Sequence, residues 1–245
     1  MASIHPKLPA TNSIERLAAS YHGIVAIAEQ RVIVPEMLDH ASPEEASKVL
    51  ADLARVNRYF GGHRILRSVV GRLAKRDEAF SMLDVGAASG DIAAAIRSAF
   101  PRATVISLDR QAFHLDHAAH PKIVADAFQL PFKPSSFDFV FSSLFLHHFT
   151  DDCVVDLLAS FGNLARRAVL AIDLERGPLA LRFLPATRWL LNWDRMFVHD
   201  GLISVRAAFK RDELRTLANR AGLQNAQVST HHPWGRLSLV APVSA

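Results

Sequence analysis

From residue 80 onward, short apolar runs alternate with helical patterns, and this alternation limits the fold more than any other feature of the chain. Short runs that end at an acidic or small polar residue predict strands at 80–85, 104–108, 123–125, 137–142 and 168–172. Strands that alternate with helices form a parallel sheet with helices on both faces. Two last runs, 226–229 and 237–241, predict a closing antiparallel hairpin. The sequence therefore predicts a doubly wound α/β fold whose seven-stranded sheet is mostly parallel.

Residues 1–78 show only helical patterns, and they predict a helical region that precedes the α/β part. Apolar residues recur at helical spacing over 14–29. Ser42, Pro43 and Glu45 form the start signal of a second helix, which Gly61-Gly62 ends, and 65–73 predicts a third. We divide the chain at 78/79, with an inserted helical lid at about 177–205. Within the α/β part, helices are predicted at 92–100, in a stretch that ends at His120, at 151–164, 179–198 and 212–221.

Composition excludes several classes of protein. Lys and Arg number 28 and Asp and Glu 24, and the net charge of +4 is scattered in pairs, so we expect no nucleic-acid partner. One cysteine, Cys153, permits neither an internal disulfide nor a cysteine-based zinc site. We find no apolar stretch of about 18 residues and no secretory leader pattern. We therefore expect no membrane span and a cytoplasmic location.

The turn after the first predicted strand reads Asp84-Val85-Gly86-Ala87-Ala88-Ser89-Gly90-Asp91. Its two glycines allow a tight turn and a close approach of a ligand to the backbone. Asp109 ends the next strand, where a carboxylate can accept both ribose hydroxyls, and Asp126 ends the third, where it can accept from an adenine amine. Ligands bind beyond the carboxyl ends of parallel strands. Together these features predict a nucleoside site at that edge of the sheet.

The identity of Asp91 selects among nucleoside cofactors. A dinucleotide fingerprint would place glycine at this position, at the start of a helix. A pyrophosphate would instead meet the Asp91 carboxylate, although it requires positive potential there. A nicotinamide-dependent oxidoreductase is therefore disfavoured. S-adenosylmethionine, which has no phosphate, suits the turn better.

Several motifs resemble those of class I S-adenosylmethionine-dependent methyltransferases, in particular the small-molecule O- and C-methyltransferases of the ubiquinone and menaquinone type. The resemblance covers roughly residues 80–241, and 57–62 looks like the end of a substrate-covering cap. It rests on the Asp84–Gly90 turn, Asp109, 126–132 with 137–140, 146–149, 209–214 and 221–223. It implies a Rossmann-like methyltransferase domain at 79–245 and a helical cap over the substrate at 1–78. One departure is Ala88, which stands where the family has its middle glycine.

The resemblance also implies the cofactor site. S-adenosyl-L-methionine is the expected cofactor, with S-adenosyl-L-homocysteine as the product. The residues expected to bind it are Asp84, Gly86, Ala87, Ala88, Gly90, Asp109, Arg110, Asp126, Ala127, Phe128, Ser142 and Ser143.

Methyl transfer from a sulfonium is an in-line displacement, so the protein mainly positions the acceptor. A phenolic acceptor must also lose a proton, and a histidine titrating near neutral pH can take it. His148, His147 and His199 are the candidate catalytic residues. The aromatic and apolar residues expected to line the acceptor pocket are Tyr59, Trp189, Trp193, Met196 and Phe197. No metal site is expected, since His114, His117 and His120 read as a polar helix face.

The sequence favours transfer of a methyl group to an oxygen or carbon of an apolar, aromatic, phenolic or quinol-like small molecule, by a monomer or a homodimer. Ala88 keeps open a second class, a non-catalytic cofactor-binding scaffold or partner subunit. An RNA or protein methyltransferase is a further alternative. The Asn/Asp-Pro-Pro-aromatic motif of adenine-amine enzymes is absent, because Ser142-Ser143-Leu144-Phe145 occupies its place.

Overall fold

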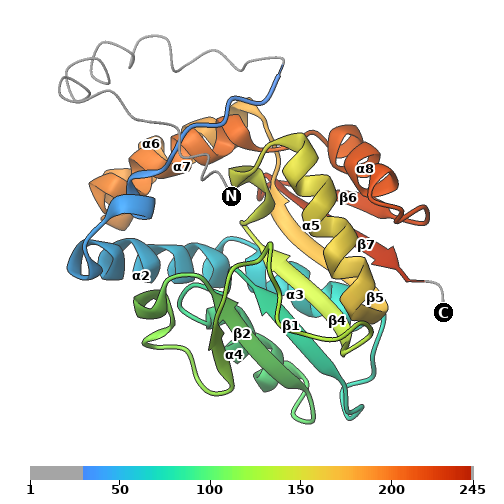
Figure 1. Ribbon diagram of the computed structural model, residues 1–245. Coiled ribbons are helices and arrows are strands. Elements are labelled where there is room, and N and C mark those ends of the chain that lie inside the picture. The colour runs from blue at the N-terminus through green and yellow to red at the C-terminus, as the bar shows by residue number, and fades with distance from the viewer. Residues whose placement is uncertain (1–29, 244–245) are drawn as a thin grey trace, which may run out of the picture.

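The computed structural model describes residues 30–243, so the helix predicted at 14–29 lies outside the described residues. Residues 30–243 form a seven-stranded sheet with the order β3-β2-β1-β4-β5-β7-β6 (Figure 1). Its strands are β1 (Ser81–Val85), β2 (Thr104–Asp109), β3 (Lys122–Val124), β4 (Phe137–Ser143), β5 (Ala165–Leu174), β6 (Gln227–His231) and β7 (Arg236–Pro242). The first five pair in parallel, whereas β7 runs antiparallel to β5 and β6. The predicted Rossmann-like fold with an antiparallel terminal hairpin is confirmed.

Helices cover both faces of the sheet. One face packs against α3 (Gly62–Val70) and α4 (Asp91–Ala99), and the other against α5 (Asp151–Leu164) and α8 (Arg211–Arg220) (Figure 1). The strand order reverses at β1, whose neighbours are β2 and β4. Such a reversal opens a crevice at the carboxyl ends of the strands, which is where a ligand site is expected.

A third group of helices lies beyond the carboxyl ends of the strands: α2 (Pro43–Tyr59), α6 (Pro178–Leu191) and α7 (Arg195–Ala207) (Figure 1). Their apolar side chains share one small core, formed by Val49 of α2 with Trp193, Phe197 and Val198. The side chain of Asp52 on α2 accepts the Asp194 N–H at 2.7 Å, which ties the two segments together. The lead-in and the insertion therefore form a single cap, called here the helical cap.

The capping box predicted at the start of α2 is present. Glu45 N–H donates to Ser42 Oγ at 3.4 Å, and the Ser42 N–H donates to Glu45 Oε2 at 3.0 Å. The helix also ends at the predicted glycine pair. Tyr59 ends α2, and Gly61, with φ of 92°, precedes the first residue of α3 in the left-handed conformation. The glycine pair thus joins two helices with a sharp turn.

Two helix predictions were wrong. The stretch predicted to run to His120 holds only the 3₁₀ turn η3 (Ala112–Leu115), where the Leu115 carbonyl accepts the Ala118 N–H at 3.0 Å and the Lys122 ammonium at 2.7 Å. In a longer α-helix, the Leu115 carbonyl would instead accept the backbone N–H four residues further along the chain. The single helix predicted at 179–198 is two helices, since Asn192 has φ of 51° and Asp194 caps α7 by accepting the Met196 N–H.

The remaining described elements are the 3₁₀ turns η2 (Met37–His40) and η4 (Leu146–His148). Within residues 30–243, no helix combines the length and the apolar character that crossing a bilayer requires.

Removal of the Asp52 carboxylate should loosen the helical cap. Asp52→Ala leaves the Asp194 N–H and the Arg55 guanidinium without this acceptor. We expect the free energy of unfolding in urea to fall by about 1–3 kcal/mol. Asp156→Ala, at an exposed position on α5, is the matched control and should change it by less than about 0.5 kcal/mol. Equal effects of the two substitutions would contradict a structural role for Asp52.

Candidate active site

A cavity of about 840 Å³ lies between the helical cap and the carboxyl ends of the strands. A volume of this size is at the upper end of the range for ligand sites. Most of the residues predicted to bind a nucleoside cofactor line it: Asp84, Gly86, Ala87, Ala88, Asp109, Arg110, Asp126, Ala127, Phe128 and Ser143. Segments that are far apart in the sequence therefore meet where the strand pattern placed them.

Gly90 and Ser142 do not line the cavity where we expected them. A Cβ atom at Gly90 would lie 2.7 Å from the Ala118 Cβ, and its φ of 71° is left-handed, so the position is held by packing. Ser142 is 1% exposed and lies inside the sheet. Gly90 thus packs within the turn after β1 and Ser142 within β4, the two segments that form this part of the cavity wall.

The turn after β1 leaves little room for side chains, and its backbone is left-handed at several residues. A Cβ at Gly86 would lie 2.4 Å from the Phe145 ring. Ala88 adopts φ of 46° despite its side chain, and its N–H donates to Asp109 Oδ2 at 3.0 Å. The turn therefore keeps its left-handed conformation and its hydrogen bond to Asp109 with an alanine at position 88.

Asp109 is held as an oriented carboxylate. Burial opposes its ionisation, but His114, 3.2 Å away, and the N–H groups of Gln111 and Ala88 outweigh burial and lower its pKa. The group is charged at neutral pH. Asp126 accepts the Phe128 N–H through Oδ1 at 2.9 Å. Each carboxylate is thus fixed in orientation at the cavity wall.

Asp84 has a different environment. It is 1% exposed, and neither carboxylate oxygen has a hydrogen-bond partner among residues 30–243. Burial, reinforced by the negative charges of Asp91 and Asp109, raises the pKa of Asp84 well above its usual value. An unpaired buried carboxyl is costly, and a cationic or donor group placed in the cavity would relieve that cost.

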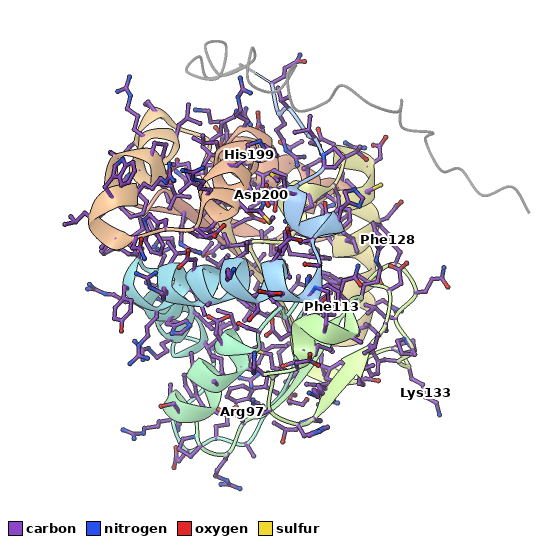
Figure 2. All side chains as sticks on the ribbon, turned by 90° about the vertical axis from the view of Figure 1, so that its left-hand side faces the viewer. Arg97, Phe113, Phe128, Lys133, His199 and Asp200 are labelled. Carbon is purple, nitrogen blue, oxygen red and sulfur yellow. The ribbon has the colours of Figure 1, made fainter. Side chains whose placement is uncertain are left out.

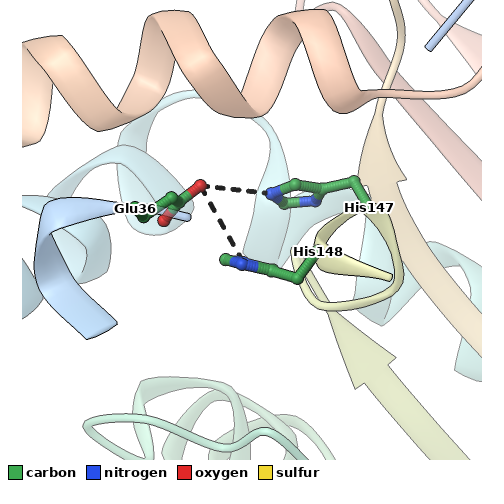
Figure 3. Close-up of side chains that lie close together, drawn as sticks. All are labelled: Glu36, His147 and His148. Atoms are coloured by element: carbon green, nitrogen blue, oxygen red, sulfur yellow. Dashed lines mark ion pairs between the residues drawn. The ribbon is translucent and has the colours of Figure 1, made fainter. Parts of the chain in front are cut away.

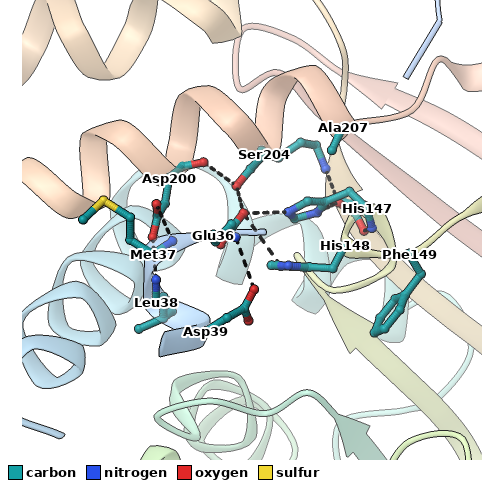
Figure 4. A network of polar contacts seen from close by, with 12 residues as sticks. Glu36, Met37, Leu38, Asp39, His147, His148, Phe149, Asp200, Ser204 and Ala207 are labelled. Atoms are coloured by element: carbon teal, nitrogen blue, oxygen red, sulfur yellow. Dashed lines mark hydrogen bonds and ion pairs between the residues drawn. The ribbon is translucent and has the colours of Figure 1, made fainter. Parts of the chain in front are cut away.

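Beyond β4, η4 places two histidines beside a carboxylate from the segment that precedes the cap (Figure 3). His147 Nδ1 lies 2.6 Å from Asp173 Oδ1 on β5, and its Nε2 lies 3.7 Å from Glu36 Oε1. His148 Nε2 lies 4.0 Å from the same oxygen. Ser204 of α7 donates to Glu36, which connects this group to the helical cap (Figure 4).

Opposite protonation states follow for the two histidines. Burial opposes protonation of His147, but Asp173 and then Glu36 outweigh it and raise the pKa of His147 to about 9. Burial and the positive charge of His147 lower the pKa of His148. Glu36 is likewise buried, yet His148 and His147 lower its pKa to about 2. At neutral pH His147 is therefore a cation between two carboxylates, and His148 is neutral and open to the cavity.

Glu36, His147 and His148 each offer one potential metal-ligand atom, and the three atoms lie within 4.8 Å of one another. The two imidazole rings are stacked, with centroids 4.4 Å apart and planes 29° apart. A cation close to both nitrogens would lie out of the plane of at least one ring, although imidazole binds metals through its in-plane lone pair. The geometry fits proton chemistry better, and the expectation of no metal site stays a prediction.

A short segment brings Glu36 into place. Arg31 donates to the backbone oxygens of Ala207 at 2.7 Å and of Phe149 at 2.9 Å, and its guanidinium stacks on the Phe209 ring. Asp200 of α7 accepts the N–H groups of Met37 and Leu38, both at 3.0 Å (Figure 4). Glu36 therefore reaches the histidines from a segment anchored on both sides.

The structure places His199 away from the cavity. Its Nδ1 lies 3.1 Å from Asp200 Oδ1 on the same helix (Figure 2), so these neighbours contact each other. His199 faces a smaller hollow that also receives Lys48 and Arg195, whereas Asp200 reaches the large cavity. His199 and Asp200 therefore face different cavities, and the His199 imidazole does not share a cavity with His148.

Of the residues predicted to line an acceptor pocket, Phe197 lines the cavity. Tyr59 and Trp189 are 62% and 85% exposed and point away, because they lie on the outer sides of α2 and α6. Trp193 and Met196 pack inside the cap core. Phe60, Phe183 and Trp234 form the aromatic wall instead, with Phe60 and Phe183 ring centroids 4.7 Å apart.

Sequence reasoning missed Glu36, Asp173 and Ser204 as parts of the site. Asp173 carried a usable signal, since it ends a predicted strand as Asp109 does. Glu36 and Ser204 lay in segments without a motif, and tertiary contacts alone bring them to the histidines.

Comparison with known proteins agrees with this geometry. Residues 83–177 match the family described as "Methyltransferase domain". Human N-acetylserotonin methyltransferase, solved with S-adenosylmethionine, is similar in structure with a TM-score of 0.63 and 17% identity over 83% of this chain. This chain spans only 57% of the human enzyme. No curated protein sequence matches.

Two further solved structures are similar over most of the chain. An S-adenosylmethionine-dependent methyltransferase from Aquifex aeolicus gives a TM-score of 0.57 at 14% identity, over 83% of this chain and all of that one (100%). Magnesium protoporphyrin IX methyltransferase from Synechocystis, solved with S-adenosylhomocysteine, gives 0.52 at 17% identity, over 75% and 84%. At such identities the likeness establishes the fold alone, a Rossmann-like methyltransferase fold.

The Asp173–His147 pair should make stability depend on pH. The folded pKa of His147, about 9, exceeds its unfolded value near 6.5, so its contribution is complete below pH 6.5 and is lost as pH rises through 9. Asp173→Asn should cost roughly 3–5 kcal/mol at pH 7 and flatten this decline. Urea unfolding between pH 6 and 10 measures both.

Asp77→Asn, at an exposed position, is the control for this series and should keep the wild-type pH profile. An unaltered decline in Asp173→Asn would show that His147 is not protonated by this pair.

Proposed function

We propose that this chain, whose residues 83–177 match the methyltransferase-domain family, binds S-adenosylmethionine and transfers its methyl group to an oxygen or carbon of an apolar, aromatic small molecule. One observation carries the proposal. A single cavity joins the carboxylates suited to a nucleoside with a neutral histidine and an apolar wall. Its volume of about 840 Å³ has room for a cofactor and an acceptor side by side.

The adenosine end is assigned to the first three strands. The oriented Asp109 carboxylate would accept the ribose hydroxyls, and Asp126 has a second oxygen that could accept an adenine amine. The half-exposed Phe128 ring stands beside Asp126 and offers a stacking face. A charge-assisted contact of the ribose to Asp109 contributes more than a neutral hydrogen bond.

The acceptor end is assigned to the helical cap. Phe60, Phe183 and Phe197 supply an apolar wall, which suits a flat aromatic ring. This supports the assignment of residues 1–78 and about 177–205 as the substrate-covering part, with 79–245 as the methyltransferase domain. A cytoplasmic location and a monomeric or homodimeric state remain predictions.

When bound in the cavity, S-adenosylmethionine would supply the methyl group to the acceptor oxygen, with S-adenosylhomocysteine as the leaving group. The hydroxyl proton passes to a ring nitrogen of His148, which releases it to solvent. His148 is suited to this role because the adjacent His147 cation keeps it neutral. His147 acts as a positioning residue, held by Asp173 and Glu36. Transfer to carbon would start from the same phenolate; the attacking ring carbon would then lose its own proton to solvent, and the oxygen would regain a proton from His148.

Cofactor binding tests the adenosine assignment. Calorimetry with S-adenosylmethionine and S-adenosylhomocysteine should show micromolar affinity and none for NADH. Asp109→Ala should weaken both adenosyl compounds more than tenfold, about 1.4 kcal/mol, because it removes a charge-assisted ribose contact. Asp116→Ala, at an exposed position nearby, is the control. Unchanged affinity in Asp109→Ala would mean that the site is misplaced, and no adenosyl binding by wild type would favour the partner-subunit alternative.

Replacement of the proposed base tests the chemistry. On a panel of phenols and quinols, His148→Gln should lower kcat by about 10²–10⁴ and leave the Kd of S-adenosylhomocysteine unchanged. Wild-type kcat/KM should fall as pH drops through the lowered pKa of His148, below 6.5. His117→Gln, an exposed histidine, is the control. A variant with full activity would remove His148 from the mechanism.

A further inference from the structure

Arg236, the first residue of β7, brings a buried positive charge to the cavity that the proposed chemistry does not use. The residue is 2% exposed. Its Nη2 donates to Asn57 Oδ1 of α2 at 3.0 Å, whereas its Nη1 is buried with no hydrogen-bond partner among the described residues. The strand and the helix thus hold the guanidinium in place with one donor nitrogen unused.

Such an arrangement is costly without a ligand. Burial lowers the pKa of Arg236 to about 10, and the charges of Asp173 and Asp91 oppose that shift, so the group stays cationic at neutral pH. No carboxylate within residues 30–243 forms an ion pair with it. A buried charge without a partner is strongly unfavourable, and a bound anion would remove the penalty.

A buried acidic group, the Asp84 carboxyl, lines the same cavity. Both oxygens of Asp84 lack partners within the described part of the chain. Asp91, at the start of α4, lines this cavity together with Asp84 and Arg236, and its charge acts on both groups. Together they match a zwitterion, with its ammonium toward Asp84 and its carboxylate toward Arg236.

We propose that Arg236, positioned by Asn57, binds a ligand carboxylate inside the cavity. Guanidinium groups pair with carboxylates through two parallel hydrogen bonds, and Nη1 is available for one of them. The amino-acid end of S-adenosylmethionine supplies both charges, and this source rests on the proposed function. A carboxylate on the methyl acceptor is the second source of the same chemistry. Arg236 lies outside residues 83–177, so the methyltransferase family match does not include it.

The first arm of the test compares two nucleosides. S-adenosylhomocysteine carries the amino-acid group, and 5′-methylthioadenosine is the corresponding thioether without it. In calorimetry, Arg236→Met should weaken S-adenosylhomocysteine at least tenfold and change 5′-methylthioadenosine less than twofold. Asn57→Ala should shift the ratio of the two dissociation constants in the same direction by a smaller factor. This ratio is taken within each variant, so a partial loss of folded protein does not alter it.

Arg167→Met is the matched control, since Arg167 is a partly buried arginine on β5 near the opposite end of the sheet. It should leave the ratio of dissociation constants at the wild-type value. Thermal unfolding of each variant identifies any that fail to fold. Asn57→Ala keeps the proposal testable if Arg236→Met does not fold.

The second arm measures benzoate against phenol, each titrated into protein saturated with 5′-methylthioadenosine. A loss of benzoate binding alone in Arg236→Met, with the nucleoside ratio unchanged, would assign the carboxylate to the acceptor. No change in either arm would overturn the proposal. Wild-type protein that binds neither nucleoside would contradict the proposed function, and benzoate titrated into the free protein would then decide the role of Arg236 alone.

Discussion

Asp173 and His147 form a buried pair, 2.6 Å apart, between the carboxyl end of β5 and the turn that follows β4. Because Asp173 also receives the backbone N–H of His147, the pair fixes both the ring and the main chain at the floor of the cavity. The His147 cation then attracts Glu36 and keeps His148 neutral. One buried interaction thus sets the protonation of the groups that face an acceptor.

Charge is distributed unevenly over the cavity wall. Asp109 and Asp173, which are already paired, hold lowered pKa values, whereas both oxygens of the buried Asp84 and the Nη1 of the buried Arg236 lack hydrogen-bond partners among residues 30–243. A protein bears such costs where a ligand offsets them, since removing the polar groups would otherwise be stabilising. The unpaired atoms therefore indicate what a ligand should carry: a donor or cation near Asp84 and an anion near Arg236.

The acceptor side depends on contacts between distant segments. The helical cap closes because Asp52 of α2 binds the start of α7 and because Arg31 binds the end of α7 and the turn after η4. Both contacts use polar side chains against backbone groups, which fixes geometry more tightly than apolar packing does. The Glu36 carboxylate meets His148 only because these contacts hold the cap over the strand ends.

The sequence by itself determined the strands, the mostly parallel sheet with its antiparallel terminal hairpin and the nucleoside-type wall, whereas the order of the strands came from the structure. Asp84, Asp109 and Asp126 follow from strand ends, and period and turn chemistry are local properties that survive in a sequence. It could not determine the helix breaks at Asn192 and after Leu115, which depend on side chains meeting particular backbone groups.

Only the tertiary structure brought Glu36, Ser204 and Arg236 to the cavity and turned Trp189 and His199 away from it. The physical reason is that helix faces and loop ends take their direction from packing between elements, which no local pattern encodes.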